Sequence, residues 1–160
     1  MTNIHPPVWP FRGLRGVDAF GAGGFGAPRD QGTRRHDGTD FISAPGDFAA
    51  APIAGKAVAR GLAYPHHAML PDLHSFHIEG TGPFKGWHVM LLYVATAPEI
   101  IGRTLEQGEE IGVCEDLPAY YALKYPNHPG LITCHVHLEL DITEARKVDA
   151  ARLLPGGIHT

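Results

Sequence analysis

Ile132-Thr-Cys-His-Val-His-Leu-Glu-Leu140 combines the apolar and branched residues of a buried β-strand with two histidines. Side chains alternate between the two faces of a strand, so His135 and His137 are expected on the same face. Imidazoles on a strand that otherwise packs a core need hydrogen-bond partners or a metal ion. The alternative is a pair of solvated or hydrogen-bonded histidines on an edge strand, because a His-x-His pattern arises often in a chain with 11 histidines.

The rest of the chain predicts a mainly β protein, built as a small antiparallel sheet or sandwich with long Pro/Gly-rich loops. Of the 160 residues, 20 are Gly and 14 are Pro, which favours turns over a helical bundle. Only two segments have a helical pattern, a short one and a C-terminal one that stops before Pro155. The predicted strands are Thr39–Ser43, Lys56–Arg60, Leu73–Glu79, Trp87–Thr96 and the segment after Gln107-Gly108 up to Val113, and the predicted helices are Leu117–Tyr125 and Glu144–Leu154.

Composition excludes several classes of function. The net charge is −4 and no basic block is present, so a nucleic-acid partner has no electrostatic basis. No apolar run approaches the roughly 20 residues that span a bilayer. The glycine-rich segment Phe20–Pro28 lacks the strand, helix and lysine of a nucleotide-binding loop. Two cysteines are too few for a disulfide scaffold, and Cys114 and Cys134 are expected to be free thiols, with a single disulfide as the alternative.

A second pattern, His36-Asp-Gly-Thr-Asp40, precedes the strand-like segment around Phe41. Together with one histidine of the His135/His137 pair, His36 and Asp40 make a set of two histidines and one carboxylate. This set suits a catalytic zinc ion with a fourth position open to water. The other strand histidine would then lie beside that position, where a general base or an oxyanion donor is needed.

In this order, the two patterns and their flanking sequence resemble the lysostaphin/LytM-type zinc endopeptidases of bacterial cell walls. The resemblance also extends to Phe25-Gly-Ala-Pro-Arg29, Ala51-Pro-Ile-Ala-Gly-Lys-Ala-Val58 and Leu105-Glu-Gln-Gly-Glu-Glu-Ile-Gly112. It implies a lysostaphin-type domain of the duplicated-hybrid-motif kind over residues 20–142. Residues 1–19 would form an irregular N-terminal segment, and residues 143–160 a C-terminal helix and tail.

Carried over to this sequence, the resemblance implies zinc (Zn2+) bound by His36, Asp40 and His137, with His135 as the catalytic histidine. The family usually has a second catalytic histidine in a Tyr-x-His-Leu strand end, where Ala95 stands here. This loss resembles a variant subgroup that includes leukocyte cell-derived chemotaxin. Tyr93 and His128 are the candidates to replace the missing group.

Three functions follow from these patterns. The first is a zinc-dependent endopeptidase that hydrolyses peptide crosslinks of peptidoglycan, and the second is a weak or inactive zinc-binding module that binds cell-wall peptide or a protein partner. The third is a β domain with incidental histidines. The N-terminus shows no signal peptide, so we expect a cytoplasmic or phage-delivered protein that acts at the bacterial cell wall, as part of a phage or cell-envelope assembly.

Overall fold

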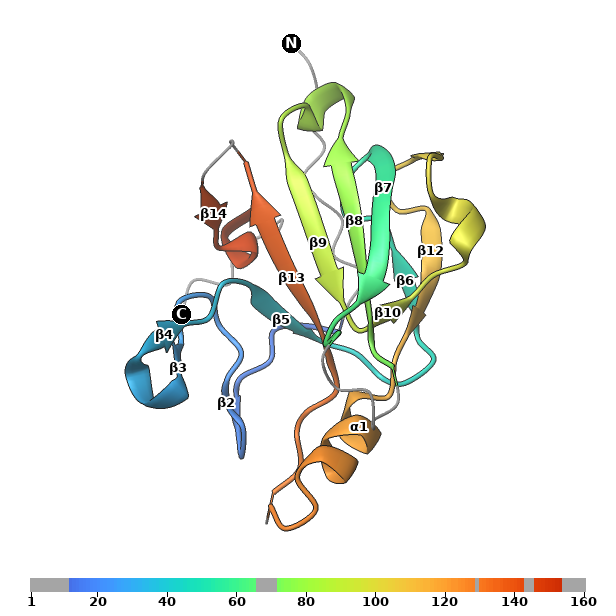
Figure 1. The fold of residues 1–160 in the computed structure, drawn as a ribbon. Helices are drawn as coiled ribbons and strands as arrows, with labels where there is room; N and C mark the ends of the chain where they lie inside the picture. The colour runs from blue at the N-terminus through green and yellow to red at the C-terminus, as the bar shows by residue number, and fades with distance from the viewer. Residues whose placement is uncertain (1–11, 66–71, 129, 143–145, 154–160) are drawn as a thin grey trace.

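The computed structural model describes residues 12–65, 72–128, 130–142 and 146–153, and Figure 1 shows them as a β protein with one α-helix in the described part. The strands are β1 Val17–Asp18, β2 Gly21–Ala22, β3 Pro28–Arg29, β4 Arg34–Arg35, β5 Thr39–Ile42, β6 Phe48–Ala50, β7 Gly55–Leu62, β8 His74–Gly80, β9 His88–Leu92, β10 Val94–Ala95, β11 Thr104–Leu105, β12 Glu110–Cys114, β13 His135–Asp141 and β14 Lys147–Val148. The helix is α1 Leu117–Lys124, and the 3-10 turns are η1 Asp30–Gly32, η2 Gly82–Phe84, η3 Pro98–Ile100 and η4 Ala150–Leu153.

The strands form two main antiparallel sheets. The larger sheet has the order β11-β7-β8-β9-β13-β14, and β5 also pairs with β13. The smaller sheet has the order β10-β12-β6. The prediction of a mainly β, antiparallel fold is therefore confirmed. Among the described residues no helix is long and apolar enough to cross a membrane.

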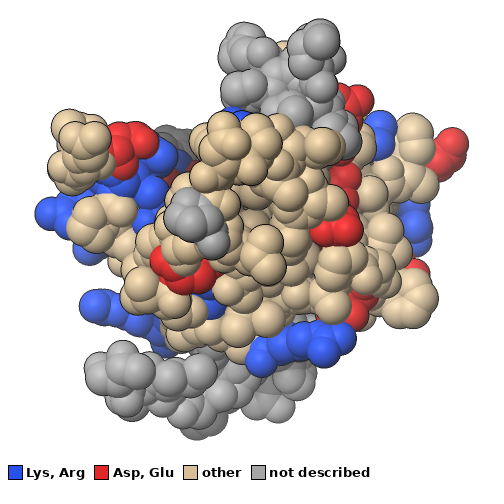
Figure 2. Space-filling view, turned by 90° about the horizontal axis from the view of Figure 1, so that it is seen from below, with Lys and Arg blue, Asp and Glu red and all other residues tan. Residues whose placement is uncertain are grey.

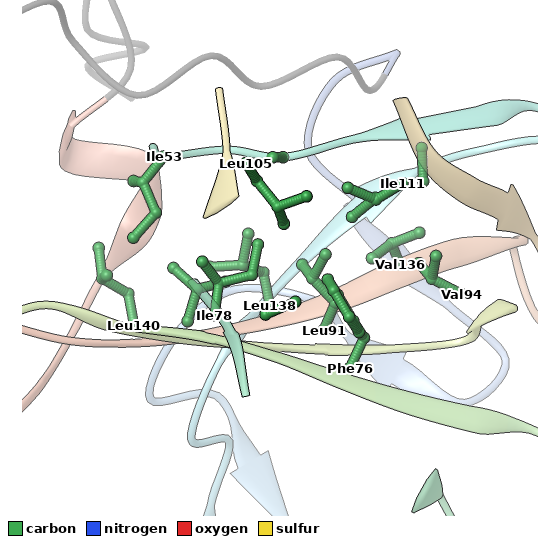
Figure 3. Packing of buried hydrophobic residues seen from close by; sticks show 14 of the residues in the cluster. Ile53, Phe76, Ile78, Leu91, Val94, Leu105, Ile111, Val136, Leu138 and Leu140 are labelled. Atoms are coloured by element: carbon green, nitrogen blue, oxygen red, sulfur yellow. The ribbon is translucent and has the colours of Figure 1, made fainter. Parts of the chain in front are cut away.

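The hydrophobic core lies between the two sheets. It explains why apolar side chains occupy every second position along the strands of the larger sheet. On β13, Val136, Leu138 and Leu140 are fully buried in this core. Figure 3 shows Leu138 and Leu140 facing Ile53 and Leu105 across the core. Each such side chain contributes about 1.5–3 kcal/mol relative to an exposed one. The odd-numbered side chains of β13, the two histidines among them, consequently lie on the other face of the sheet.

The predicted strand Trp87–Thr96 is divided at Tyr93, which has a φ of 72°. Before this residue the chain belongs to the larger sheet as β9, and after it to the smaller sheet as β10. Backbone hydrogen bonds hold the corner, because the Tyr93 N–H donates to the His74 carbonyl and the Tyr93 carbonyl accepts from Glu115. A period-2 pattern does not report such a change of sheet, since both halves are extended.

Helix α1 confirms the predicted helix that begins at Leu117. The Asp116 side chain accepts a hydrogen bond from the Ala119 N–H at 3.0 Å, and Pro118 occupies the first turn. The helix buries Leu117 and Tyr120 in a second apolar cluster. This cluster supports one end of the larger sheet.

The prediction of a C-terminal helix over Glu144–Leu154 is wrong for the residues that the structure describes. Lys147 and Val148 extend the sheet as β14, and Ala150–Leu153 makes only a 3-10 turn. Val148 packs on the core, and Lys147 forms an ion pair with Glu139 of β13. Pairing with the edge of β13 thus outweighs local helix propensity. Cys114 and Cys134 are free thiols, as expected.

Candidate metal centre

The register of β5 against β13 brings the predicted metal ligands together. His137 and Asp40 are directly paired across the two strands, and His36 lies just before β5. Asp40 Oδ1 is 3.0 Å from His137 Nδ1 and 3.2 Å from His36 Nε2. The two imidazole nitrogens are 2.9 Å apart. All three side chains are buried, and together they form a group that could hold a metal ion.

Hydrogen bonds on the far side of each imidazole determine which nitrogen faces the centre. His36 Nδ1 lies 2.9 Å from the Gly24 carbonyl, and His137 Nε2 lies 3.2 Å from a Glu139 carboxylate oxygen. Both partners are acceptors, so these nitrogens carry the protons and donate. The facing nitrogens, His36 Nε2 and His137 Nδ1, then present lone pairs to each other unless one ring is protonated.

This arrangement fits a zinc ion. Two donors bound at 2.0–2.1 Å to one tetrahedral zinc ion lie about 3.3 Å apart, close to the 2.9–3.2 Å observed here. A cation would also remove the repulsion between the two lone pairs. Burial alone would lower the pKa of His137, but the carboxylates of Asp40 and Glu139 outweigh burial and raise it.

Asp40 is held from its other side by a buried arginine. Arg15 Nη1 donates to Asp40 Oδ2 at 2.8 Å, while Arg15 Nε and Nη2 donate to the two oxygens of Asp18 at 2.8 and 2.6 Å. Burial would raise the pKa of Asp40, but the neighbouring His137 and His36 rings outweigh it and hold the pKa well below its ordinary value. The Asp40 carboxylate is therefore ionised and fixed in place.

His135 lies beside this centre on the same face of β13. Its Nδ1–H donates to the Thr133 carbonyl at 2.7 Å, and its Nε2 is 3.5 Å from Asp40 Oδ2. Burial lowers the pKa of His135 to about 4. The ring is therefore neutral near pH 7, with the unprotonated Nε2 directed toward the site.

Ala95, where the resemblance expects a second catalytic histidine, follows the corner at Tyr93. Ala95 pairs with Val113 in the smaller sheet and is not among the residues that line the cleft over the metal centre. Leu92 lines that cleft instead and is the direct cross-strand partner of His137. The assignment of the missing histidine to Ala95 therefore stays a prediction, and Leu92 is a second position from which an imidazole would face the centre, because the chain turns into the smaller sheet only at Tyr93.

The two candidate replacements differ in position. The Tyr93 ring packs edge-on against the His135 ring, with ring centroids 5.5 Å apart, and its hydroxyl is 2.6 Å from the Tyr64 hydroxyl. His128 stacks on Phe20 at 4.1 Å and lines an adjoining hollow, not the cleft over the metal centre. Of the two, the structure brings only Tyr93 to His135.

Sequence reasoning missed four residues that support the centre. Arg15 and Asp18 hold Asp40, and Glu139 orients His137. Gly38 lies so close to His137 that a Cβ on it would be 2.7 Å from the His137 ring and 2.5 Å from the Leu138 carbonyl. The glycine within the first pattern and the glutamate two residues after His137 were available as signals, whereas Arg15 and Asp18 lie in a segment without periodicity.

The metal centre opens into a cleft of about 400 Å³. One wall comes from β3 and the segment around η1, and another from α1 and the Tyr64 segment after β7. Figure 2, which views the molecule from below, shows basic side chains gathered at the left, on the side where β3 and β4 lie in Figure 1. The centre is therefore buried but reachable by a ligand of peptide size.

Comparisons with known proteins agree with this architecture. Neither a protein-family model nor a curated protein matches the sequence. Among solved structures, LytU has a TM-score of 0.56 at 19% identity and covers 94% of this chain and 92% of its own. A zinc-containing peptidase from Vibrio cholerae has a TM-score of 0.55 at 18% identity, with 92% of this chain and 38% of that chain covered.

The antimicrobial peptidase lysostaphin from Staphylococcus simulans has a TM-score of 0.54 at 17% identity, with 86% of this chain and 52% of that chain covered. This chain thus spans about half or less of the lysostaphin and Vibrio cholerae chains. At these identities the likeness concerns the fold, and the predicted lysostaphin-type fold is confirmed.

Proposed function

We propose that this chain, which has the fold of the lysostaphin-type peptidases, is a zinc-dependent endopeptidase that hydrolyses peptide crosslinks of bacterial peptidoglycan. The observation that carries the proposal is the metal centre itself. Two imidazole lone pairs and one carboxylate oxygen converge within 2.9–3.2 Å of one another at the base of a cleft. Three protein donors with an open side are typical of catalytic rather than structural zinc sites.

The residues of the centre would have two roles, metal binding and proton transfer. His36, Asp40 and His137 would hold the zinc ion, which when bound supplies Lewis-acid polarisation of a peptide carbonyl and activation of water. His135 presents an unprotonated Nε2, whose orientation is fixed by the bond from Nδ1 to Thr133. It can accept a proton at that nitrogen and return it to the departing amine.

Arg15 has a positioning role in this scheme. Because it binds Asp40 Oδ2, the other oxygen of Asp40 remains directed toward the two histidines. The bidentate contact with Asp18 fixes the guanidinium in turn. A rigid carboxylate of this kind keeps the ligand geometry constant during catalysis.

Leu92 favours a second candidate function, a zinc-binding module that binds cell-wall peptide or a protein partner with little or no turnover. Leu92 presents no imidazole to the centre, and Ala95 stands where the resemblance expects the second histidine. Loss of one oxyanion donor typically costs about 10²–10³ in rate. The zinc ligands themselves are unaffected by this change, so binding would persist without fast hydrolysis.

The test is digestion of crosslinked muropeptides by purified, zinc-loaded protein, followed by chromatography and mass spectrometry. We expect new peptide ends with the wild type and none with His135→Ala, whose zinc content should equal that of the wild type. His77→Ala, on the same sheet but outside the cleft lining, is the matched control and should leave cleavage unchanged. Untouched muropeptides in every sample, with zinc bound, would contradict the peptidase and favour the binding module.

The site of action is part of the same proposal. A peptidoglycan substrate places the protein at the bacterial cell wall, delivered by a phage or held in a cell-envelope assembly. Localisation of a tagged protein during infection or growth checks this part separately from the chemistry.

A further inference from the structure

The charges that line the cleft are not balanced. Its four carboxylates all have cationic or imidazole partners: Asp30 is 2.9 Å from Arg34, Asp37 is 3.7 Å from Lys147, and Asp40 and Glu139 are held within the metal centre. The lining cations are Arg15, Arg29, Arg34 and Lys124. Arg15 forms ion pairs with Asp18 and Asp40, and Arg34 forms one with Asp30.

Arg29 and Lys124 remain as cations without a hydrogen-bonded carboxylate among the described residues. Arg29 Nη2 approaches Asp40 Oδ2 only to 3.9 Å, and Arg29 Nη1 donates a hydrogen bond to the Pro28 carbonyl at 3.2 Å. Its side chain is only 17% exposed.

Lys124 is held by aromatic rings instead of by a carboxylate. Its Nζ lies 4.8 Å from the ring centroid of Tyr64 and 5.3 Å from that of Tyr125. Such contacts stabilise the ammonium group but leave its N–H donors available. The lysine is the last residue of α1 and lines the cleft from a different element than Arg29.

The surface between these cations is aromatic. Tyr121 lines the cleft, and its ring packs edge-on against Phe20 at 5.0 Å. It also lies near enough to Arg29 to interact with it electrostatically. The lining of the cleft therefore offers a peptide both aromatic surface and two cations.

We propose that Arg29 and Lys124 form an anion subsite, which makes the cleft selective for peptides that carry a free carboxylate over neutral peptides such as oligoglycine. The inference rests on the proposed function for the identity of the substrate as a peptide. It adds the charge class of that peptide, which the metal centre leaves open. A bound zinc ion would increase the positive potential of the cleft and so reinforce the same preference.

The test compares two capped, fluorescently labelled pentapeptides that differ only in a central glutamate or glutamine. Affinities for the zinc-loaded protein are measured by fluorescence anisotropy. We expect about tenfold tighter binding of the glutamate peptide, equivalent to about 1.4 kcal/mol. The preference should fall steeply between 50 and 500 mM salt because exposed charges are screened.

Variants assign the preference to the two cations. Lys124→Gln and Arg29→Gln should each reduce the preference severalfold, while Lys124→Arg keeps the charge and should retain it. Lys56→Gln removes an exposed lysine of β7 outside the cleft lining and should leave the preference unchanged. Zinc content and Tm, measured for every variant, distinguish loss of the subsite from loss of folding.

Two results would overturn the subsite. The first is equal or undetectable binding of the two peptides by the wild type. The second is an equal loss of affinity for the glutamate and the glutamine peptide when either cation is removed. Hydrolysis of the same peptides, followed separately, concerns the proposed function. Cleavage without a charge preference rejects the subsite alone. A charge preference without cleavage of peptides or muropeptides retains the subsite and counts against the peptidase.

Discussion

At the scale of single residues, the position of Leu92 matters most for activity. It lies in one row across the sheet with Asp40 and His137, on the face that carries the metal centre. Ala95, three residues later, belongs to a different sheet. The resemblance expects the missing histidine at Ala95, whereas the structure brings Leu92 to the cleft.

We predict that Leu92→His increases hydrolysis by about 10²–10³, because it adds an imidazole donor that lines the cleft opposite His137. The measurement is kcat/KM on a muropeptide, with zinc content as a check on the site. Ala95→His is the matched control and should have no effect. A gain with the Ala95 variant alone would show that the placement of the missing group at Leu92 is wrong.

Asp18 is a residue whose ionisation stabilises the fold. Besides Arg15, it accepts hydrogen bonds from the N–H groups of Phe20 and Thr133, so it joins the N-terminal segment to the chain just before β13. Burial would raise the pKa of Asp18, but the Arg15 hydrogen bonds and these N–H donors outweigh it and lower the pKa well below its ordinary value.

A group with a lowered folded-state pKa stabilises the protein above its unfolded pKa of about 4 and loses this contribution as the pH falls. We predict that Asp18→Asn costs about 1.5–3 kcal/mol at pH 7 and progressively less below pH 4. Chemical denaturation of both proteins at pH 7, 5 and 3 measures this difference. A gap between the two proteins that stays constant over this range would show that the Asp18 charge is not responsible.

At the scale of elements, the loop from His36 to β5 is shaped by its contact with β13. Gly38 faces the His137 ring and the Leu138 carbonyl with no room for a side chain. We predict that Gly38→Ala displaces His137, lowers zinc affinity by at least tenfold and lowers Tm. Zinc affinity is measured by competition with a chromophoric chelator.

Gly16→Ala is the control for this substitution, because a Cβ at Gly16 meets nothing within 4 Å and its backbone needs no left-handed conformation. Equal zinc affinity of Gly38→Ala and wild type would mean that the loop adjusts at no cost. The contact would then not determine the ligand geometry.

The strands around the site were predictable for a physical reason. Alternation of apolar residues on β13 reflects burial on one face of the sheet, so the common face of His135 and His137 followed from the segment itself. The corner at Tyr93 and the strand β14 were not predictable. Each depends on which strand the chain meets in space. At β14 the local sequence pattern predicted a helix, but pairing with β13 gives a strand.

The site was predictable in the same partial way. Short-range patterns indicated His36, Asp40 and the His135/His137 pair, and the resemblance chose His137 as the third candidate ligand; the structure groups these three side chains. Arg15 meets Asp40 only after the N-terminal segment folds across β5, at a separation of 25 residues. No local period records a contact of this kind.

At the scale of the whole molecule, the metal centre joins distant parts of the chain. The ligands His36 and His137 are 101 residues apart, and the Arg15–Asp40 pair adds the N-terminal segment. A ligand that binds only the folded state stabilises it by about 2.7 kcal/mol at 100 times its Kd. We predict that zinc raises Tm by about 5–10 °C over the chelator-treated protein.

Differential scanning calorimetry with and without added zinc measures this shift. His36→Ala supplies the control, because it removes one donor and should abolish most of the zinc-dependent increase. An increase that survives in His36→Ala would indicate that zinc stabilises the protein from another place.

The two faces of the larger sheet have different roles. One face packs on the core, and the other carries the candidate metal centre and the cleft. Substitutions at the odd-numbered positions of β13 or at Leu92 therefore leave the apolar packing of Val136, Leu138 and Leu140 in place. Such a separation allows new specificities to evolve, or to be engineered, on an unchanged scaffold. Chains of this kind can diverge in the reaction they perform while they remain recognisable by their shape alone.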